Sequence, residues 1–286
     1  MEIELPGIID MHVHYGPAPV PPGVGITHSV TAIEATREAA AAGFAAIVLK
    51  ASDRSTAGLG DILEEVVEGI RVFGGVVLDR AVGGLNPYVV EQTMLLGGKI
   101  VWLPTSGSRN DAVLYGGTAA DGIAVTDDDG EPVAAVKEIF ELILANDAIL
   151  ATGHITAEEH FGIARAFGKT GRVLVTHAGE SLAGPALNAA QCAELAALGA
   201  IIEFSAQTCV DAWGREAMSI EDHVAMIRAA GVGQSILSTD YGWNNDLPHP
   251  AQGMLDYCER LSTAGFSVDE LRQMACDTPA RLLGIA

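Results

Sequence analysis

The sequence predicts a single α/β domain folded as a (β/α)8 TIM barrel. Its 286 residues are close to the roughly 250 that such a barrel takes. Eight short apolar runs, typical of parallel strands covered on both faces, alternate with stretches of helical periodicity. No shift in composition divides the chain, so we expect one domain over residues 1–286.

The predicted strands share a short length and a high content of Val, Ile, Leu and Ala. They are 8–14, 45–49, 72–78, 99–103, 148–154, 172–177, 200–205 and 235–240. Because each β-α unit is compatible with a right-handed crossover, the carboxyl ends of all these strands should open at one mouth of the barrel.

The predicted helices fill the intervals between the strands. The first is capped by Thr27 or Ser29 and ends at Ala42, with His28 in the cap region. The others are 61–70, 86–96, 133–145, a helix opening at Thr156, then 185–198, 219–230, 255–263 and 268–283. Glu159 completes a capping box with Thr156, Pro185 lies in a first turn, and His223 is expected on a solvent-facing side.

Residues 109–132 form the longest irregular stretch between predicted elements. The Asp129-Gly130 pair indicates a hairpin tip within it. Long insertions in compact domains are usually functional or disordered, so we interpret this stretch as a lid or hairpin insertion.

Composition limits the classes of partner. Sixteen Lys and Arg against 37 Asp and Glu give a net charge of -21, which disfavours nucleic acid and anionic membrane surfaces. The four cysteines form no C-x-x-C pair and are interpreted as reduced thiols of a cytoplasmic protein. We find no basic leader and no apolar run of about 18 residues. The expected partner is a small molecule, and a homo-oligomer stays open.

Side chains suited to metal binding stand at the carboxyl ends of four predicted strands. His12 and His14 end the first strand, while His154, His177 and Asp240 end the fifth, sixth and eighth. Imidazole and carboxylate bind zinc and similar ions, and catalytic sites keep one position open. The sequence therefore predicts a divalent metal site, most simply Zn²⁺ with one or two ions, against the alternative of core histidines.

This pattern resembles the amidohydrolase superfamily of metal-dependent barrel hydrolases, and specifically a largely uncharacterised branch. The closing segment Thr278-Pro279-Ala280-Arg281 is also similar. The resemblance implies that His12, His14 and Asp240 hold one metal, and that Asp240 accepts the proton of a water. It implies that His154 and His177 hold a second metal or orient substrate.

One departure from that family concerns the fourth strand. Relatives with two metals carry a bridging lysine or glutamate at its end, whereas this chain has Leu103-Pro104-Thr105 there. Lys99 lies at the opposite end of that strand. Lys50, at the mouth end of the second strand, can replace the bridge, contact substrate, or be a surface lysine.

Basic residues follow several strands on one side of the predicted mouth. The predicted substrate contacts are Lys50, Arg54, Arg80, Thr105 and Arg109. They favour an anionic substrate, and the alternative is solvated charges paired with Asp53, Asp79 and Asp111.

The leading functional hypothesis is a metal-dependent hydrolase that attacks an amide, ester or lactone with metal-activated water. The first alternative is a mononuclear-metal decarboxylase or hydratase on the same scaffold. The second is a barrel that binds metal without catalysis.

Overall fold

The computed structural model of the chain describes residues 5–18, 27–211, 214, 216–243 and 246–285. Within these residues, eight parallel strands form one sheet in chain order. They are β1 (Ile9–His14), β2 (Ala46–Lys50), β3 (Arg71–Val77), β4 (Ile100–Trp102), β5 (Ile149–Ala151), β6 (Val173–Val175), β7 (Ile201–Ser205) and β8 (Ser235–Ser238). Beyond β8, Asp240 N donates to His12 O at 2.9 Å and His14 N donates to Tyr241 O at 2.8 Å. The predicted barrel is confirmed.

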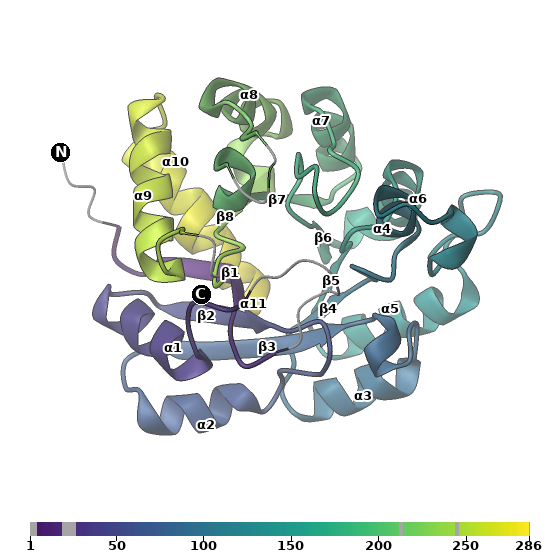
Figure 1. The fold of residues 1–286 in the computed structure, drawn as a ribbon, viewed down its shortest axis with the longest axis horizontal. Helices are drawn as coiled ribbons and strands as arrows, with labels where there is room; N and C mark the ends of the chain where they lie inside the picture. The colour runs from purple at the N-terminus through teal and green to yellow at the C-terminus, as the bar shows by residue number, and fades with distance from the viewer. Residues whose placement is uncertain (1–4, 19–26, 212–213, 215, 244–245, 286) are drawn as a thin grey trace.

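Helices surround the strands, with α1 to α3 along one side and α7 to α9 along the opposite side (Figure 1). The helices are α1 (Ala32–Ala41), α2 (Leu59–Val66), α3 (Pro87–Leu95), α4 (Arg109–Leu114), α5 (Ala134–Ala145), α6 (Ala157–Phe167), α7 (Ala189–Ala197), α8 (Ile220–Ala230), α9 (Pro250–Thr263), α10 (Val268–Arg272) and α11 (Thr278–Leu283). None of the described helices is both long and apolar enough to cross a membrane.

Two buried clusters form the core. All eight strands contribute to the inner one, which fills the barrel: Ile9, Met11, Ala46, Val48, Phe73, Val77, Ile100, Trp102, Ile149, Ala151, Leu174, Ile201 and Ile236, with Leu282 and Leu283 of α11. The larger outer cluster lies between strands and helices and includes Ile8 and Val13. Because both faces of the strands are covered, their sequences are apolar without strict alternation.

A bulge in β1 directs its histidines into the mouth. Strict alternation would place residue 12 on the same side as Ile8, which packs in the outer cluster. The pairing of β1 with β2 shifts between Asp10 and Val13. Such a bulge changes the face that following side chains occupy, so His12 and His14 both point inward.

Capping chemistry explains where the helices begin and corrects two predictions. Thr31, not Thr27 or Ser29, caps α1, and it forms a capping box with Glu34. His28 instead stacks on the Trp243 ring at a centroid distance of 4.8 Å. Helix α7 begins after an Asn188 cap, so Pro185 lies before the helix rather than in its first turn. The capping box of Thr156 and Glu159 on α6 is confirmed.

The insertion at 109–132 is more regular than the sequence indicates. Its first part is α4, capped by Ser108. A tight turn follows at residues 127–130, where Gly130 N donates to Asp127 O at 3.0 Å and Thr126 bridges to Pro132. The predicted hairpin tip is present, while its role as a lid stays a prediction.

The prediction that His223 faces solvent is wrong. The side chain is fully buried, with its Nε2 hydrogen-bonded to the Tyr257 hydroxyl at 2.5 Å and its ring edge-on to Phe204. Burial lowers the pKa of His223 from 6.5 to about 3. The polar residue sits on the buried side of α8 because Tyr257 of α9 supplies its partner.

We expect His223→Gln to flatten the acid side of the stability profile. Between the unfolded pKa of 6.5 and the folded pKa of about 3, the unfolded chain binds the extra proton, so stability falls as the pH decreases. This single group contributes a slope of at most about 1.4 kcal/mol per pH unit. Urea unfolding between about pH 5 and pH 7 measures the slope. His249→Gln, at a half-exposed surface site beside Glu38, is the control; equal slopes in both variants would contradict the prediction.

Candidate metal centre

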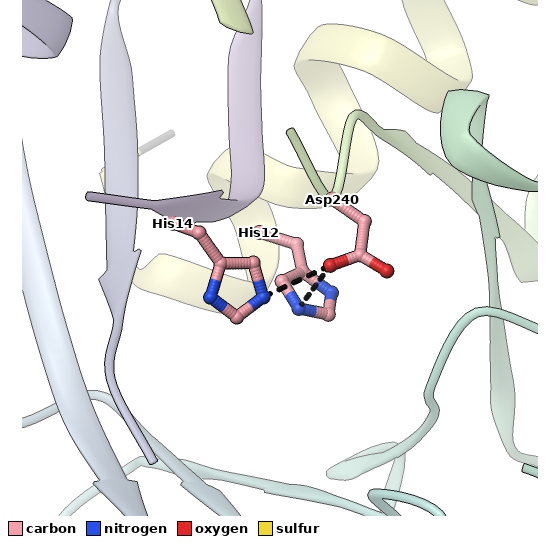
Figure 2. A group of neighbouring side chains, drawn as sticks. All are labelled: His12, His14 and Asp240. Carbon is pink, nitrogen blue, oxygen red and sulfur yellow. Dashed lines mark ion pairs between the residues drawn. The ribbon is translucent and has the colours of Figure 1, made fainter. Parts of the chain in front are cut away.

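Three predicted ligands, His12, His14 and Asp240, form a compact group at the barrel mouth, which we call the metal group. The Nε2 atoms of His12 and His14 each lie 3.0 Å from Asp240 Oδ1. Figure 2 shows both imidazoles turned toward one carboxylate oxygen, while the second oxygen points away from them. One ligand atom from each residue lies within 4.8 Å of the others, and all three residues are buried.

Backbone contacts between β1 and the end of β8 set the position of Asp240. Asp240 has a left-handed φ of 60°, a conformation that Asp tolerates better than most residues. The preceding Thr239 donates to the Asp10 carboxylate from its backbone nitrogen at 3.0 Å and from its hydroxyl at 2.5 Å. Asp10 is therefore a structural anchor beneath the site, and burial raises its pKa to about 7.

Burial favours the neutral form of the His12 and His14 imidazoles. Burial holds the pKa of His12 well below 6.5, although Asp240 opposes the shift. Burial and the nearby Lys50 likewise hold the pKa of His14 well below 6.5. Neutral imidazole is the form that binds metal.

The donor set fits a divalent metal. Donor atoms that lie about 2.0 to 2.2 Å from one ion in a tetrahedral site are about 3.3 to 3.6 Å from one another, and the 3.0 Å contacts at Asp240 are only slightly shorter. Two imidazole nitrogens and one carboxylate oxygen are also a usual protein contribution to a site with an open position.

Lys50 contacts this group through His12. Its Nζ lies 3.0 Å from His12 Nε2 and 5.7 Å from the centroid of the Trp102 ring. The side chain is only 3% exposed, so Lys50 is not the surface lysine that the sequence also allowed. Burial lowers the pKa of Lys50, and Asp240 and Glu203 oppose that shift.

His154 and His177 lie beside the group of three. The His177 ring stacks on His12 at a centroid distance of 5.8 Å, and His154 is 4.8 Å from His177. Burial holds the pKa of His177 well below 6.5. Its Nε2 is buried and has no hydrogen-bond partner among the described residues. The structure thus brings all four predicted histidines together, and the buried Nε2 of His177 could take a ligand.

The predicted arginine contacts bond to loops and to neighbouring acidic side chains, and their role toward a substrate stays a prediction. Arg54 donates to Pro17 O at 2.5 Å and pairs with Asp53, and Arg80 donates to the backbone oxygen of Asp121. Arg109 lies 3.8 Å from Glu159. Within the described part of the chain, Lys50 is the one predicted basic residue hydrogen-bonded to a predicted ligand.

Thr105 is buried and its hydroxyl donates to Asp79 at 2.5 Å. Asp79 also accepts from the backbone nitrogens of Thr105 and Gly107, both at 2.9 Å. The carboxylate that follows β3 therefore holds the loop after β4, and the Thr105 hydroxyl in this loop is already bonded to it.

Two carboxylates at the site were missed from the sequence. Glu203 Oε1 lies 2.9 Å from His12 Nδ1, and Asp111 Oδ2 lies 2.6 Å from His154 Nδ1. Glu203 gave a signal, because it is a charged residue inside an otherwise apolar strand. Asp111 gave none, since its role depends on α4 folding back over the mouth.

Solved structures share this fold. N-isopropylammelide isopropylaminohydrolase from Burkholderia multivorans has a TM-score of 0.57 at 17% identity, with 98% of this chain and 75% of that chain covered. A dipeptidase described as a metallopeptidase has a TM-score of 0.64 at 13% identity, with 98% of each chain covered. A mutant of organophosphorus hydrolase from Deinococcus radiodurans has a TM-score of 0.58 at 14% identity, with 99% and 94% covered. At such identities the similarity is one of fold.

The barrel and the His-His-Asp group at its mouth agree with the sequence resemblance to the amidohydrolase superfamily. The chain belongs to a family of unknown function, DUF6282, whose model matches residues 7–203. No protein of curated function matches the sequence.

Proposed function

We propose that this protein is a metal-dependent hydrolase that cleaves an amide, ester or lactone bond of a small molecule. The observation that carries the proposal is the group formed by His12, His14 and Asp240, in which one carboxylate oxygen lies 3.0 Å from two imidazole nitrogens. The hydrolases and peptidase that share the fold support the same class of chemistry.

A bound divalent metal lowers the pKa of water from about 15.7 towards about 7 and polarises a carbonyl. His12 and His14 would hold it through Nε2, and Asp240 through Oδ1. The second carboxylate oxygen of Asp240 is then free to accept a proton from the attacking water and to return it to the leaving group. We propose Zn²⁺, because imidazole and carboxylate ligands suit it.

The substrate is proposed to be small and anionic, and the protein cytoplasmic. With Arg54, Arg80 and Arg109 holding loops, the anion contact falls to Lys50, whose buried ammonium lies beside His12. A charged donor shielded from solvent binds a carboxylate more strongly than an exposed one.

A mononuclear-metal decarboxylase or hydratase is the second candidate. The observation favouring it is the loop after β4, where Thr105 is hydrogen-bonded to Asp79 and contributes no metal bridge. A panel of esters, lactones and N-acyl amino acids, assayed with the Zn²⁺-loaded protein before and after chelation, tests hydrolysis. Chelator-sensitive release of CO₂ from carboxylic acids without hydrolysis would favour the alternative, and metal binding without turnover would leave a binding barrel.

Metal content tests the role of Lys50. We expect about one metal per chain in both the wild type and Lys50→Ala, with a raised KM for an anionic substrate in the variant, because Lys50 contacts substrate. Lys99→Ala is the matched control, since Lys99 precedes β4 at the opposite end of the barrel. Two metals in the wild type falling to one in Lys50→Ala would instead make Lys50 a bridging ligand.

A further inference from the structure

We propose that Glu203 and Asp111 are positioning residues, each of which accepts the Nδ1 proton of a mouth histidine and leaves the Nε2 of that histidine unprotonated. Glu203 acts on His12 and Asp111 acts on His154. The use of these tautomers in metal binding rests on the proposed function, but the first test uses the metal-free protein.

Glu203 is placed to act only as an acceptor. It is 1% exposed and accepts from the Ser238 hydroxyl at 2.6 Å and the His177 backbone nitrogen at 3.0 Å, besides contacting His12 Nδ1 at 2.9 Å. Two donors, the Ser238 hydroxyl and the His177 backbone nitrogen, already bond to the carboxylate and favour its ionised form. The partner nitrogen of His12 must then carry its proton at Nδ1.

The Lys50 contact on the opposite side of the His12 ring agrees with the same tautomer. In that tautomer the Lys50 ammonium, whose Nζ lies 3.0 Å from His12 Nε2, donates to the unprotonated nitrogen. Asp240 Oδ1 also lies 3.0 Å from it, which brings two acceptors together. Two acceptor atoms in contact repel each other unless a cation lies beside them. The Lys50 ammonium or a metal ion can be that cation.

The three contacts of Glu203 also link three strands that carry predicted ligands. His12 belongs to β1, His177 follows β6, and Ser238 ends β8 two residues before Asp240. One side chain on β7 thereby sets the tautomer of one ligand and the spacing of the backbone that carries two others.

Asp111 gives an independent second case. Its Oδ2 lies 2.6 Å from His154 Nδ1, and its side chain is 2% exposed against 13% for the imidazole. The backbone nitrogen of Asp111 is held by the Ser108 cap at 3.0 Å, and the Ser108 hydroxyl donates to His154 O at 2.8 Å. The start of the insertion at 109–132 is thus built onto His154 at two points.

Nitrogen-15 NMR of histidine-labelled, metal-free protein reads the tautomers directly. We expect His12 and His154 to carry their protons at Nδ1 in the wild type. In Glu203→Gln the amide nitrogen of the side chain must face another donor in either orientation, the His12 Nδ1–H or the His177 backbone N–H. The contact with His12 is therefore disturbed, so the nitrogen signals of His12 should change while those of His154 stay the same. Asp111→Ala should change only His154.

Zn²⁺ titration supplies the second readout. Loss of an outer carboxylate typically weakens metal binding about 10- to 100-fold, and we expect a loss in that range for Glu203→Gln. Glu159→Gln is the matched control: Glu159 is 2% exposed and, among the described residues, bonds to the backbone nitrogens of Val125 and Thr156 besides its contact with Arg109. Its affinity should stay within about threefold of the wild type.

A wild-type spectrum with His12 protonated at Nε2 would overturn the inference, even if Glu203→Gln failed to fold. Equal Zn²⁺ affinities in Glu203→Gln and Glu159→Gln would also overturn it. Because neither readout uses turnover, failure to find hydrolysis would count against the proposed function and leave this inference standing.

Discussion

Asp240→Asn should lower kcat about 10²- to 10⁴-fold on any substrate that the wild type hydrolyses, the usual contribution of a general acid or base. Asparagine keeps the shape of the side chain and tolerates the left-handed φ of 60° at this position. Its amide, however, cannot accept a proton from water, and it is a weaker metal ligand than a carboxylate. Steady-state kinetics at saturating Zn²⁺, with metal content measured in parallel, separates the two effects.

Asp246→Asn is the matched control for this variant. Asp246 has a φ of 61° and is exposed, so the same substitution is made in the same backbone conformation at a surface position. We expect wild-type kinetics from the control. Activity of Asp240→Asn within about threefold of the wild type would remove Asp240 from the catalytic role.

The ends of the strands explain why so much of this site could be predicted from the sequence. A parallel barrel brings all carboxyl ends to one mouth, so His12, His14 and Asp240 could be grouped once the strands were located. Each strand was found from a local apolar run that needs no knowledge of distant contacts. The prediction survived an unforeseen bulge in β1, because the bulge redirects both histidines together.

Contacts between distant segments could not be predicted in this way. Glu203 and His12 are separated by 191 positions, and Asp111 and His154 by 43. The same limit explains the error at His223, whose partner Tyr257 lies on the next helix. A polar residue in an amphipathic helix indicates solvent only when no buried partner is available.

The predicted basic cluster shows a further limit. Sequence position after a strand places a residue near the mouth but does not say what its side chain contacts. Arg54 and Arg80 both donate to backbone oxygens of loops. Lys50 differs because it is the last residue of β2 rather than a loop residue, so its direction is fixed by the strand itself.

Gly242→Ala is expected to damage both the fold and the metal group. Gly242 has a φ of 116°, and a Cβ there would lie 1.9 Å from His14 O. The backbone around it carries the hydrogen bond from His14 N to Tyr241 O that joins β8 to β1. A methyl group must therefore push the end of β8 away from the strand that bears both ligand histidines.

We expect a loss of roughly 2 to 5 kcal/mol in the free energy of unfolding, from backbone strain and overpacking together, and weaker Zn²⁺ binding by the fraction that folds. Gly265→Ala isolates the contact, because Gly265 has a similar φ of 102° with no atom within 4 Å of the added Cβ. The Gly265→Ala control introduces backbone strain without the close contact, so its loss of unfolding free energy should be smaller and its Zn²⁺ affinity unchanged. Equal losses of unfolding free energy in the two variants, measured by urea unfolding, would contradict the prediction. They would mean that the end of β8 can move at little cost and that its contact with β1 does not hold Asp240 against the histidines.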